Sequence, residues 1–105
     1  MIQRNKKARP IHPGEMLKED FLAPLGLSAN KLALELHVPA TRVADIVRGR
    51  RAITADTALR LGRYFGTSAG FWLNIQARYD LDLAEDAAAE EIERYVHPRT
   101  ATARA

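Results

Sequence analysis

Residues 28–51, SANKLALELHVPATRVADIVRGRR, predict two short helices joined by a tight turn and followed by a basic loop. Apolar residues recur at helical spacing in both halves of the stretch: Leu32, Ala33 and Leu36, then Val43, Ile46 and Val47. Ser28 is a good N-cap for the first helix, because its hydroxyl can accept a hydrogen bond from an orphan backbone N–H. Pro39 cannot continue the first helix but suits the opening of the second, and Gly49 can end the second because glycine tolerates a left-handed conformation.

Two helices of this length with a turn of about three to four residues match the helix-turn-helix unit, whose second helix enters the major groove of DNA. With its apolar face buried, the second helix presents these residues outward near its start: Ala40, Thr41, Arg42 and Asp45. Arg42 could bind guanine or clamp a phosphate, and Thr41 could hydrogen-bond or touch a thymine methyl group. Asp45 could accept a hydrogen bond from a cytosine amino group, or it could orient Arg42 at i, i+3 spacing.

Basic residues on both sides of this helix are suited to the DNA backbone. Lys31 lies in the first turn of the first helix, where the helix dipole disfavours a cation, and a phosphate bound there would remove the conflict. Three arginines flank Gly49 in the loop that follows the second helix. The predicted DNA-binding set is Ser28, Lys31, Ala40, Thr41, Arg42, Asp45, Arg48, Arg50 and Arg51. The alternative is that these are ordinary solvated charges on a small helical domain.

The composition agrees with a small DNA-binding protein. A length of 105 residues predicts one domain, and domains of this size often dimerise. Residues 1–78 hold 13 Lys and Arg against 6 Asp and Glu, whereas residues 79–105 hold 3 against 7. The basic part suits nucleic acid, and the acidic end should point away from DNA or toward another partner. With no cysteine, no apolar run long enough to cross a membrane and no signal-peptide pattern, we expect a cytoplasmic protein.

The remaining segments predict further helices and no strands. One begins near Pro13, one is capped by Thr54, and one is capped by Ser68 and carries a heavy apolar content around Trp72. Part of that apolar content should close the core and the remainder could form a dimer interface. The predicted fold is all-α, a five-helix domain that contains the helix-turn-helix unit, with an additional C-terminal helix. We expect a flexible basic arm at 1–11, the DNA-binding domain at 12–80, a C-terminal helix at 81–97 for dimer or partner contact, and a disordered tail at 98–105.

Catalysis and cofactor binding are not expected. His12, His37 and His97 lie far apart, and none has a companion at metal-ligand spacing. The acidic cluster around Asp82 has neither the glycine nor the bidentate anchor of a calcium-binding loop. The two serines are helix caps, with no base at a recognisable spacing.

Three segments together give a more specific signal than the helix-turn-helix pattern alone. They are the HPGE opening at 12–15, the RGRRAIT segment at 48–54, and the GTS…FWLN segment at 66–74. On these segments the chain, from about Ile11 to Leu83, strongly resembles the HigA family of antitoxins, within the larger Cro and phage-repressor (XRE-type) group.

The resemblance implies that the five-helix domain is lambda-repressor-like. It also implies a dimer that binds double-stranded operator DNA at its own promoter and neutralises a HigB-like toxin, an mRNA-cleaving ribonuclease. Carried over by position, the exposed residues of the second helix face the bases, while Lys31 and residues 48–51 support them on the backbone. Two positions depart from the family pattern. His37 stands where glycine is common, so it must adopt a positive φ or shift the turn, and Pro39-Ala40 replaces a polar pair. The alternatives are a stand-alone phage-type repressor without a toxin and, more weakly, a helical adaptor with no DNA role.

Overall fold

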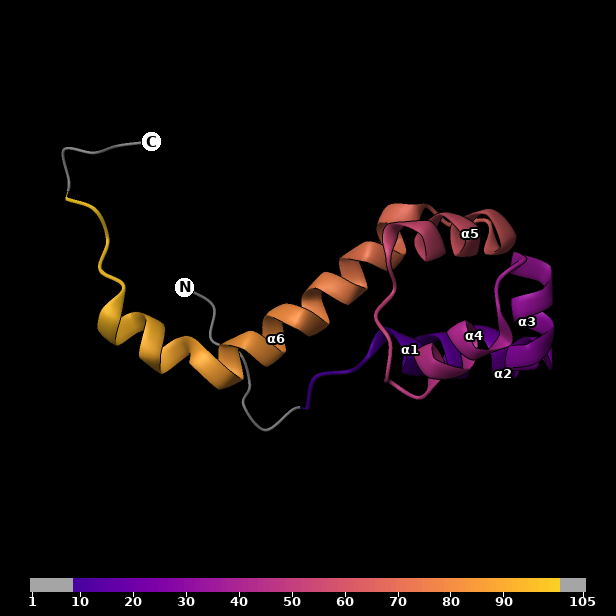
Figure 1. The fold of residues 1–105 in the computed structure, drawn as a ribbon, viewed down its shortest axis with the longest axis horizontal. Helices are drawn as coiled ribbons and strands as arrows, with labels where there is room; N and C mark the ends of the chain where they lie inside the picture. The colour runs from indigo at the N-terminus through magenta and orange to yellow at the C-terminus, as the bar shows by residue number, and fades with distance from the viewer. Residues whose placement is uncertain (1–8, 101–105) are drawn as a thin grey trace.

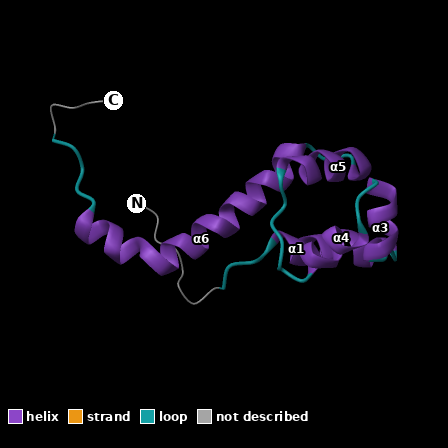
Figure 2. Cartoon of the chain, viewed as in Figure 1, coloured by secondary structure: helices purple, strands orange, loops and turns teal. Residues whose placement is uncertain are grey.

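The computed structural model describes residues 9–100, and every regular element in that range is a helix (Figures 1 and 2). The elements in chain order are α1 (Pro13–Met16), η1 (Leu17–Leu22), α2 (Ala23–Leu25), α3 (Ala29–Leu36), α4 (Ala40–Val47), α5 (Ala55–Phe65) and α6 (Ala69–Tyr95). The first three run on without a break, so the described chain forms five helical rods. The predicted all-α class and helix-turn-helix arrangement are confirmed.

The first rod begins where the sequence predicted, with Pro13 in its first position and His12 as its N-cap. Its middle is a π-helical segment, η1, that the sequence analysis did not anticipate. There the N–H of Ala23 reaches back to the carbonyl of Lys18, five residues earlier. Pro24 follows and has no N–H to donate, so the wider turn lies where a regular α-helical ladder could not continue. Gly26 then ends the rod in the left-handed conformation.

The helix-turn-helix unit is formed by α3, a short turn and α4. Ser28 caps α3 by accepting a hydrogen bond from the N–H of Lys31 at 3.0 Å, as predicted. His37 ends α3 with φ of 58°, so of the two alternatives, a positive φ or a shifted turn, the structure has the positive φ. Histidine tolerates this region better than β-branched residues do, which permits the turn without glycine. Pro39 is the N-cap of α4, and its extended backbone turns the chain into the second helix.

The core gathers side chains from every rod. Its fully buried members come from both helices of the unit and from the segments around it: Leu17, Leu32, Val43, Ile46, Leu61 and Trp72. Burying each of these side chains contributes roughly 1.5–3 kcal/mol. The indole N–H of Trp72 donates to Thr67 Oγ1 at 2.8 Å, so this polar group remains paired inside the core. Trp72 packs against Phe21 with ring centroids 4.8 Å apart, so most of the apolar content of α6 near Trp72 belongs to the core.

Two glycines mark close backbone approaches. A Cβ on Gly14 would lie 1.7 Å from the carbonyl oxygen of Ile46, so α1 can pack on the end of α4 only because residue 14 has no side chain. A Cβ on Gly62 would lie 2.9 Å from the carbonyl oxygen of Thr67. Gly62 therefore allows α5 to lie directly against the loop that opens α6.

The predicted separation between a fifth helix and a C-terminal helix is wrong. One helix, α6, runs for 27 residues from Ala69 to Tyr95 and extends away from the body (Figure 1). No proline or glycine interrupts the chain between Gly70 and Pro98, and Ala, Leu and Glu favour continuation. Side-chain pairs at i, i+4 also span the expected break, with Gln76 donating to Asp80 at 3.0 Å and Arg78 lying 3.6 Å from Asp82.

The ends of the chain lie mostly outside the described residues, so the predicted arm at 1–11 and tail at 98–105 stay predictions there. Just before α1, Arg9 Nη2 donates to both carboxylate oxygens of Glu15, at 2.8 Å to Oε2 and 3.0 Å to Oε1. No helix within residues 9–100 has both the length and the apolar character needed to cross a membrane.

Candidate nucleic-acid interface

The second helix of the unit, α4, is anchored on one face and open at its start. Val43 and Ile46 are each 1% exposed and fix the helix against the core. Ala40 and Thr41 occupy the first turn and are exposed. Pro39 makes no side-chain capping hydrogen bond to the backbone N–H groups of that turn, and the side chains of Ala40 and Thr41 beside them are small. A helix held in this way can present its N-terminal turn to a groove without burying bulky side chains there.

Arg42 is not oriented by Asp45, the partner considered from the sequence. Its Nη1 atom lies 2.9 Å from Oδ2 of Asp56, at the first turn of α5. The same oxygen accepts a hydrogen bond from Arg60 Nε at 2.9 Å. The hydrogen bond from Arg60 and, beside it, the one from Arg42 hold the pKa of Asp56 below its usual value. The Arg42 side chain remains 28% exposed, so it is positioned and still reachable.

Arg60 is a residue that the sequence analysis did not assign. Its Nη1 atom donates to the carbonyl oxygens of Leu36 and His37, at 2.9 and 3.4 Å. These carbonyls end α3, so Arg60 ties α5 to the turn of the helix-turn-helix unit. Its i, i+4 spacing from Asp56 was visible in the sequence, but the carbonyl contacts lie 24 and 23 residues away.

At the start of α3, Lys31 has a protein partner. Its Nζ lies 3.2 Å from Glu35 Oε2, one turn further along the helix. This pair offsets the unfavourable position of a cation near the helix N-terminus, so a phosphate is not needed to explain Lys31. The Lys31 side chain is 58% exposed, and an exposed pair of this kind is worth only ~0–1 kcal/mol, so a phosphate can replace Glu35 at little cost.

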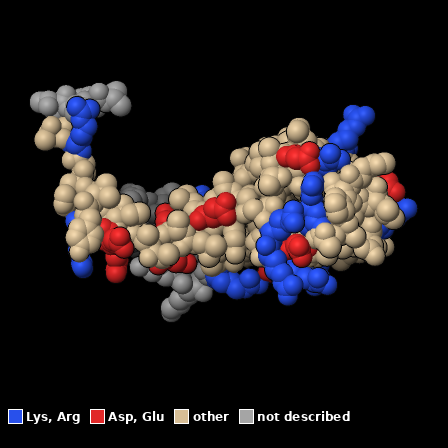
Figure 3. Space-filling view, viewed as in Figure 1, with Lys and Arg blue, Asp and Glu red and all other residues tan. Residues whose placement is uncertain are grey.

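The basic loop after α4 is fixed by its backbone and exposes its arginines. Arg48, Arg50 and Arg51 are all exposed. The N–H of Gly49 donates to the Ile46 carbonyl at 3.0 Å, and that of Arg50 donates to the Asp45 carbonyl at 2.8 Å. In Figure 3 the Lys and Arg atoms gather over the body around this loop, whereas Asp and Glu atoms recur along the projecting α6.

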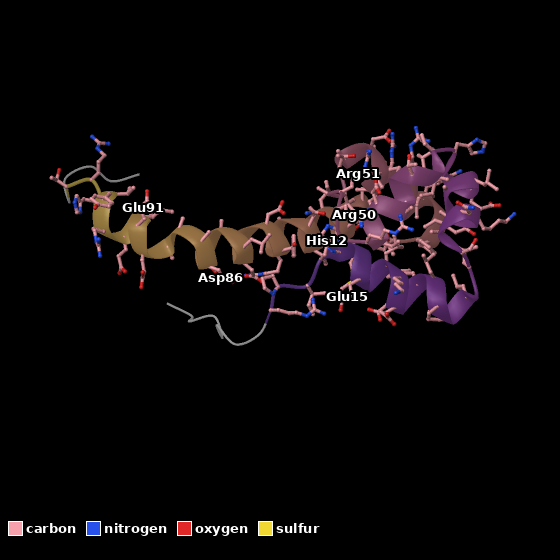
Figure 4. The ribbon with its side chains drawn as sticks, turned by 60° about the horizontal axis from the view of Figure 1, so that its bottom comes forward. His12, Glu15, Arg50, Arg51, Asp86 and Glu91 are labelled. Carbon is pink, nitrogen blue, oxygen red and sulfur yellow. The ribbon has the colours of Figure 1, made fainter. Side chains whose placement is uncertain are left out.

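The sequence raises His12 only as a metal ligand or catalytic base, whereas in the structure it caps α1 and contacts α6. Its Nδ1 accepts a hydrogen bond from the N–H of Gly14 at 2.9 Å. Its ring meets Tyr79 of α6 edge-on, with centroids 4.9 Å apart, and lies close to the backbone of Arg51. Figure 4 shows His12 near Arg50 and Arg51, where α6 leaves the body. Burial lowers the pKa of His12, against the opposing effects of Asp80 and the Arg51 backbone.

The part of the chain that the structure describes contains no group of three His, Cys, Asp or Glu side chains arranged to hold a metal ion. The arrangement of exposed α4 residues beside a basic loop is instead one that can contact a polyanion by hydrogen bonds and charge.

Comparison with known proteins agrees with this geometry. A family model described as helix-turn-helix matches residues 17–72. The chain is 61% identical over 85 residues to virulence-associated protein I of Dichelobacter nodosus, covering 80% of this chain and 79% of that protein. It is 37% identical over 95 residues to antitoxin HigA-1 of Vibrio cholerae, covering 90% and 89%. The solved structure of "Pseudomonas aeruginosa antitoxin HigA with higBA promoter" superposes with a TM-score of 0.85 at 50% identity, covering 88% of this chain and 100% of that one.

Proposed function

The chain belongs to the helix-turn-helix family that contains the HigA antitoxins, and on that premise we propose that it binds its own operator DNA as a dimer and neutralises a HigB-like ribonuclease toxin. The observation that carries the DNA-binding part is the anchoring of α4 by two buried residues, Val43 and Ile46, while Ala40 and Thr41 stay exposed. The HigA antitoxin of Pseudomonas aeruginosa, solved with promoter DNA, supports the same reading.

In the proposed complex the first turn of α4 enters the major groove. Thr41 then contacts a base edge or a thymine methyl group, and Ala40 allows the close approach. Arg42 reaches a guanine or a phosphate from the position in which Asp56 holds it. Asp45 lies one turn further along, partly buried, and accepts from a cytosine amino group.

The phosphate contacts come from two places in the unit. Ser28 and Lys31 mark the N-terminus of α3, where backbone N–H groups and the helix dipole favour an anion. Arg48, Arg50 and Arg51 supply the second group of contacts from the exposed loop. These contacts fix the register of the protein on DNA and carry no sequence information themselves.

The dimer is proposed to form along the outer part of α6. From residue 83 to residue 100 every described side chain except Ala88 is exposed, although several are large and apolar. The large exposed apolar residues from residue 81 onward are Leu81, Leu83, Ile92, Tyr95 and Val96. A second copy of the helix would cover them, and a two-fold dimer would place two α4 helices one DNA turn, ~34 Å, or a multiple of it apart.

The charge of the chain indicates what kind of protein the toxin would be, but it assigns no individual toxin-contact residues. A ribonuclease that binds mRNA must itself be basic to hold a polyanion. Residues 79–105 hold 7 Asp and Glu against 3 Lys and Arg, so this end of the chain complements such a protein. Acidic side chains occur at intervals along α6, among them Asp86 and Glu91 (Figures 3 and 4).

The toxin proposal is tested by capturing the tagged protein from its native cell lysate and identifying the retained proteins by mass. We expect a small basic partner at a one-to-one ratio, encoded by the neighbouring gene and lethal when expressed alone. Recovery of the protein by itself, with operator binding intact, would instead support a stand-alone repressor.

A further inference from the structure

The C-terminal end of the basic loop, at Ile53, is fixed to α6 by a buried hydrogen bond. The backbone N–H of Ile53 donates to Gln76 Oε1 at 2.8 Å, across 23 residues of sequence. Both partners are buried, with Ile53 2% exposed and Gln76 6% exposed. A buried amide is costly unless it is paired, so this glutamine is tied to one partner and one orientation. Its Nε2 donates to Asp80 Oδ1 at 3.0 Å, which turns Oε1 toward the loop.

His12 lies beside the same loop at two earlier positions. Its ring is near Gly49, where an added Cβ would come within 3.7 Å of His12 Cγ, and it lies close to the backbone of Arg51. Its Nδ1 accepts a hydrogen bond from the N–H of Gly14. Tyr79 of α6 meets the ring edge-on, so His12 stands between the loop and α6.

The loop backbone is hydrogen-bonded at 53 and lies beside His12 at 49 and 51, while the side chains of Arg48, Arg50 and Arg51 stay in solvent. Cationic side chains on an unfastened loop would lose conformational freedom on meeting a phosphate, and a loop fastened beforehand loses less.

We propose that Gln76 and His12 are positioning residues of the DNA interface, which hold the arginine loop against α6 so that it meets the DNA backbone in a fixed place. The inference rests on the proposed function. It also means that α6, the helix proposed to hold two protomers together, sets the position of the phosphate-binding loop in each of them.

The test compares substitutions on α6 in the full-length protein, by fluorescence anisotropy with its upstream DNA at several salt concentrations. Gln76→Leu keeps the size of the side chain and removes the acceptor for Ile53. We expect its affinity to fall about tenfold and the slope of log K against log salt to lose about 1–2 in magnitude, since each phosphate contact contributes about 0.9. Gln76→Asn keeps the amide but is one methylene too short, so we expect the same direction of change if the leucine variant does not fold.

Two controls separate positioning from general damage. The double variant Gln76→Glu with Asp80→Asn keeps the net charge and an acceptor for the Ile53 N–H, and it reverses the second hydrogen bond, in which the new amide at position 80 donates to the new carboxylate at position 76. We therefore expect affinity within about twofold of the wild type. Asn74→Leu makes a comparable polar-to-apolar change at an exposed position of α6, and it should leave both the affinity and the salt slope unchanged.

The inference is overturned if Gln76→Leu or Gln76→Asn lowers the unfolding temperature yet leaves affinity and salt slope at wild-type values. Failure of the wild-type protein to bind its upstream DNA would be a different result. It would remove the proposed function, and this inference with it.

Discussion

Arg42 Nη1 lies 2.9 Å from Asp56 Oδ2, so the arginine at the start of the DNA-facing helix is held by the first turn of the next helix. Because Arg60 shares that carboxylate and also binds the carbonyls that end α3, one acidic side chain links α3, α4 and α5. The position of Arg42 is therefore a property of the folded unit and not of α4 alone.

If Arg42 reads a base, Arg42→Ala should relax sequence preference at one position of the operator and cost about 1–3 kcal/mol of discrimination. Asp56→Asn should produce a weaker loss in the same direction, because Arg42 keeps its charge and loses its orientation. Binding to a panel of operator variants measures both. An equal loss on every sequence would make Arg42 a phosphate contact.

Gly14→Ala should destabilise the protein by about 3 kcal/mol or more, because the new Cβ would fall 1.7 Å from the carbonyl oxygen of Ile46 and neither backbone can move freely. Gly70→Ala is the matched control. Its Cβ would meet only Ser68 Oγ at 3.8 Å, and we expect a gain of roughly 0.5–1 kcal/mol from helix propensity. Urea denaturation measures both changes. A Gly14→Ala variant as stable as the wild type would contradict the close packing of α1 on α4.

His12 should make stability depend on pH between neutral and mildly acidic conditions. Burial lowers its pKa in the folded state from 6.5, so the neutral form is favoured and the unfolded chain binds more protons in this window. The stabilisation of the folded state by neutral His12 is thus fully present above pH 6.5, and it is lost as the pH falls toward the lowered pKa of His12. The groups facing His12 are Asp80, Tyr79 and the Arg51 backbone, and Asp80 opposes the shift.

His12→Asn is the matching variant, because asparagine can still cap α1 but does not titrate. Thermal unfolding measured across this pH range should show a flatter profile for His12→Asn than for the wild type. Parallel profiles would remove His12 as the source of the dependence.

Ile92→Glu should separate the protomers without unfolding them. Ile92 is 52% exposed in the single chain, so the substitution does not touch the core. It places a charge in the proposed dimer contact of α6, where desolvation would be costly. Light scattering should report a lower mass for Ile92→Glu than for the wild type, with unchanged helicity. If the wild type is a monomer, or if the dimer survives the substitution, the proposed dimer contact around Ile92 of α6 is wrong.

Local features of the fold were predictable from the sequence because neighbouring residues decide them. The caps Ser28, Thr54 and Ser68 accept backbone hydrogen bonds within their own first turns, and His37 has the positive φ that its position required. The continuity of α6 is harder to predict, because acidic residues such as those after Tyr79 also favour the first turn of a new helix, although nothing there breaks the helix.

The site was less predictable because its contacts join distant parts of the chain. The Arg42–Asp56 pair spans 14 residues and the Ile53–Gln76 hydrogen bond spans 23. Helical periodicity predicts only contacts between residues three or four positions apart. It therefore favours Asp45, at i, i+3, as the partner of Arg42. Gln76 had no distinguishing feature in sequence, since a buried amide on a helix is recognised only when its partner is known.

The central claim is that this chain reads operator DNA through α4 and its basic loop. It is tested most directly by titrating the wild-type protein into its own upstream DNA and into a scrambled sequence of equal length, over a range of salt concentrations. We predict tighter binding to the upstream DNA and a steep loss of affinity with salt, with a slope of about −0.9 per phosphate contacted. Equal affinity for both sequences, or an affinity that salt leaves unchanged, would contradict the claim.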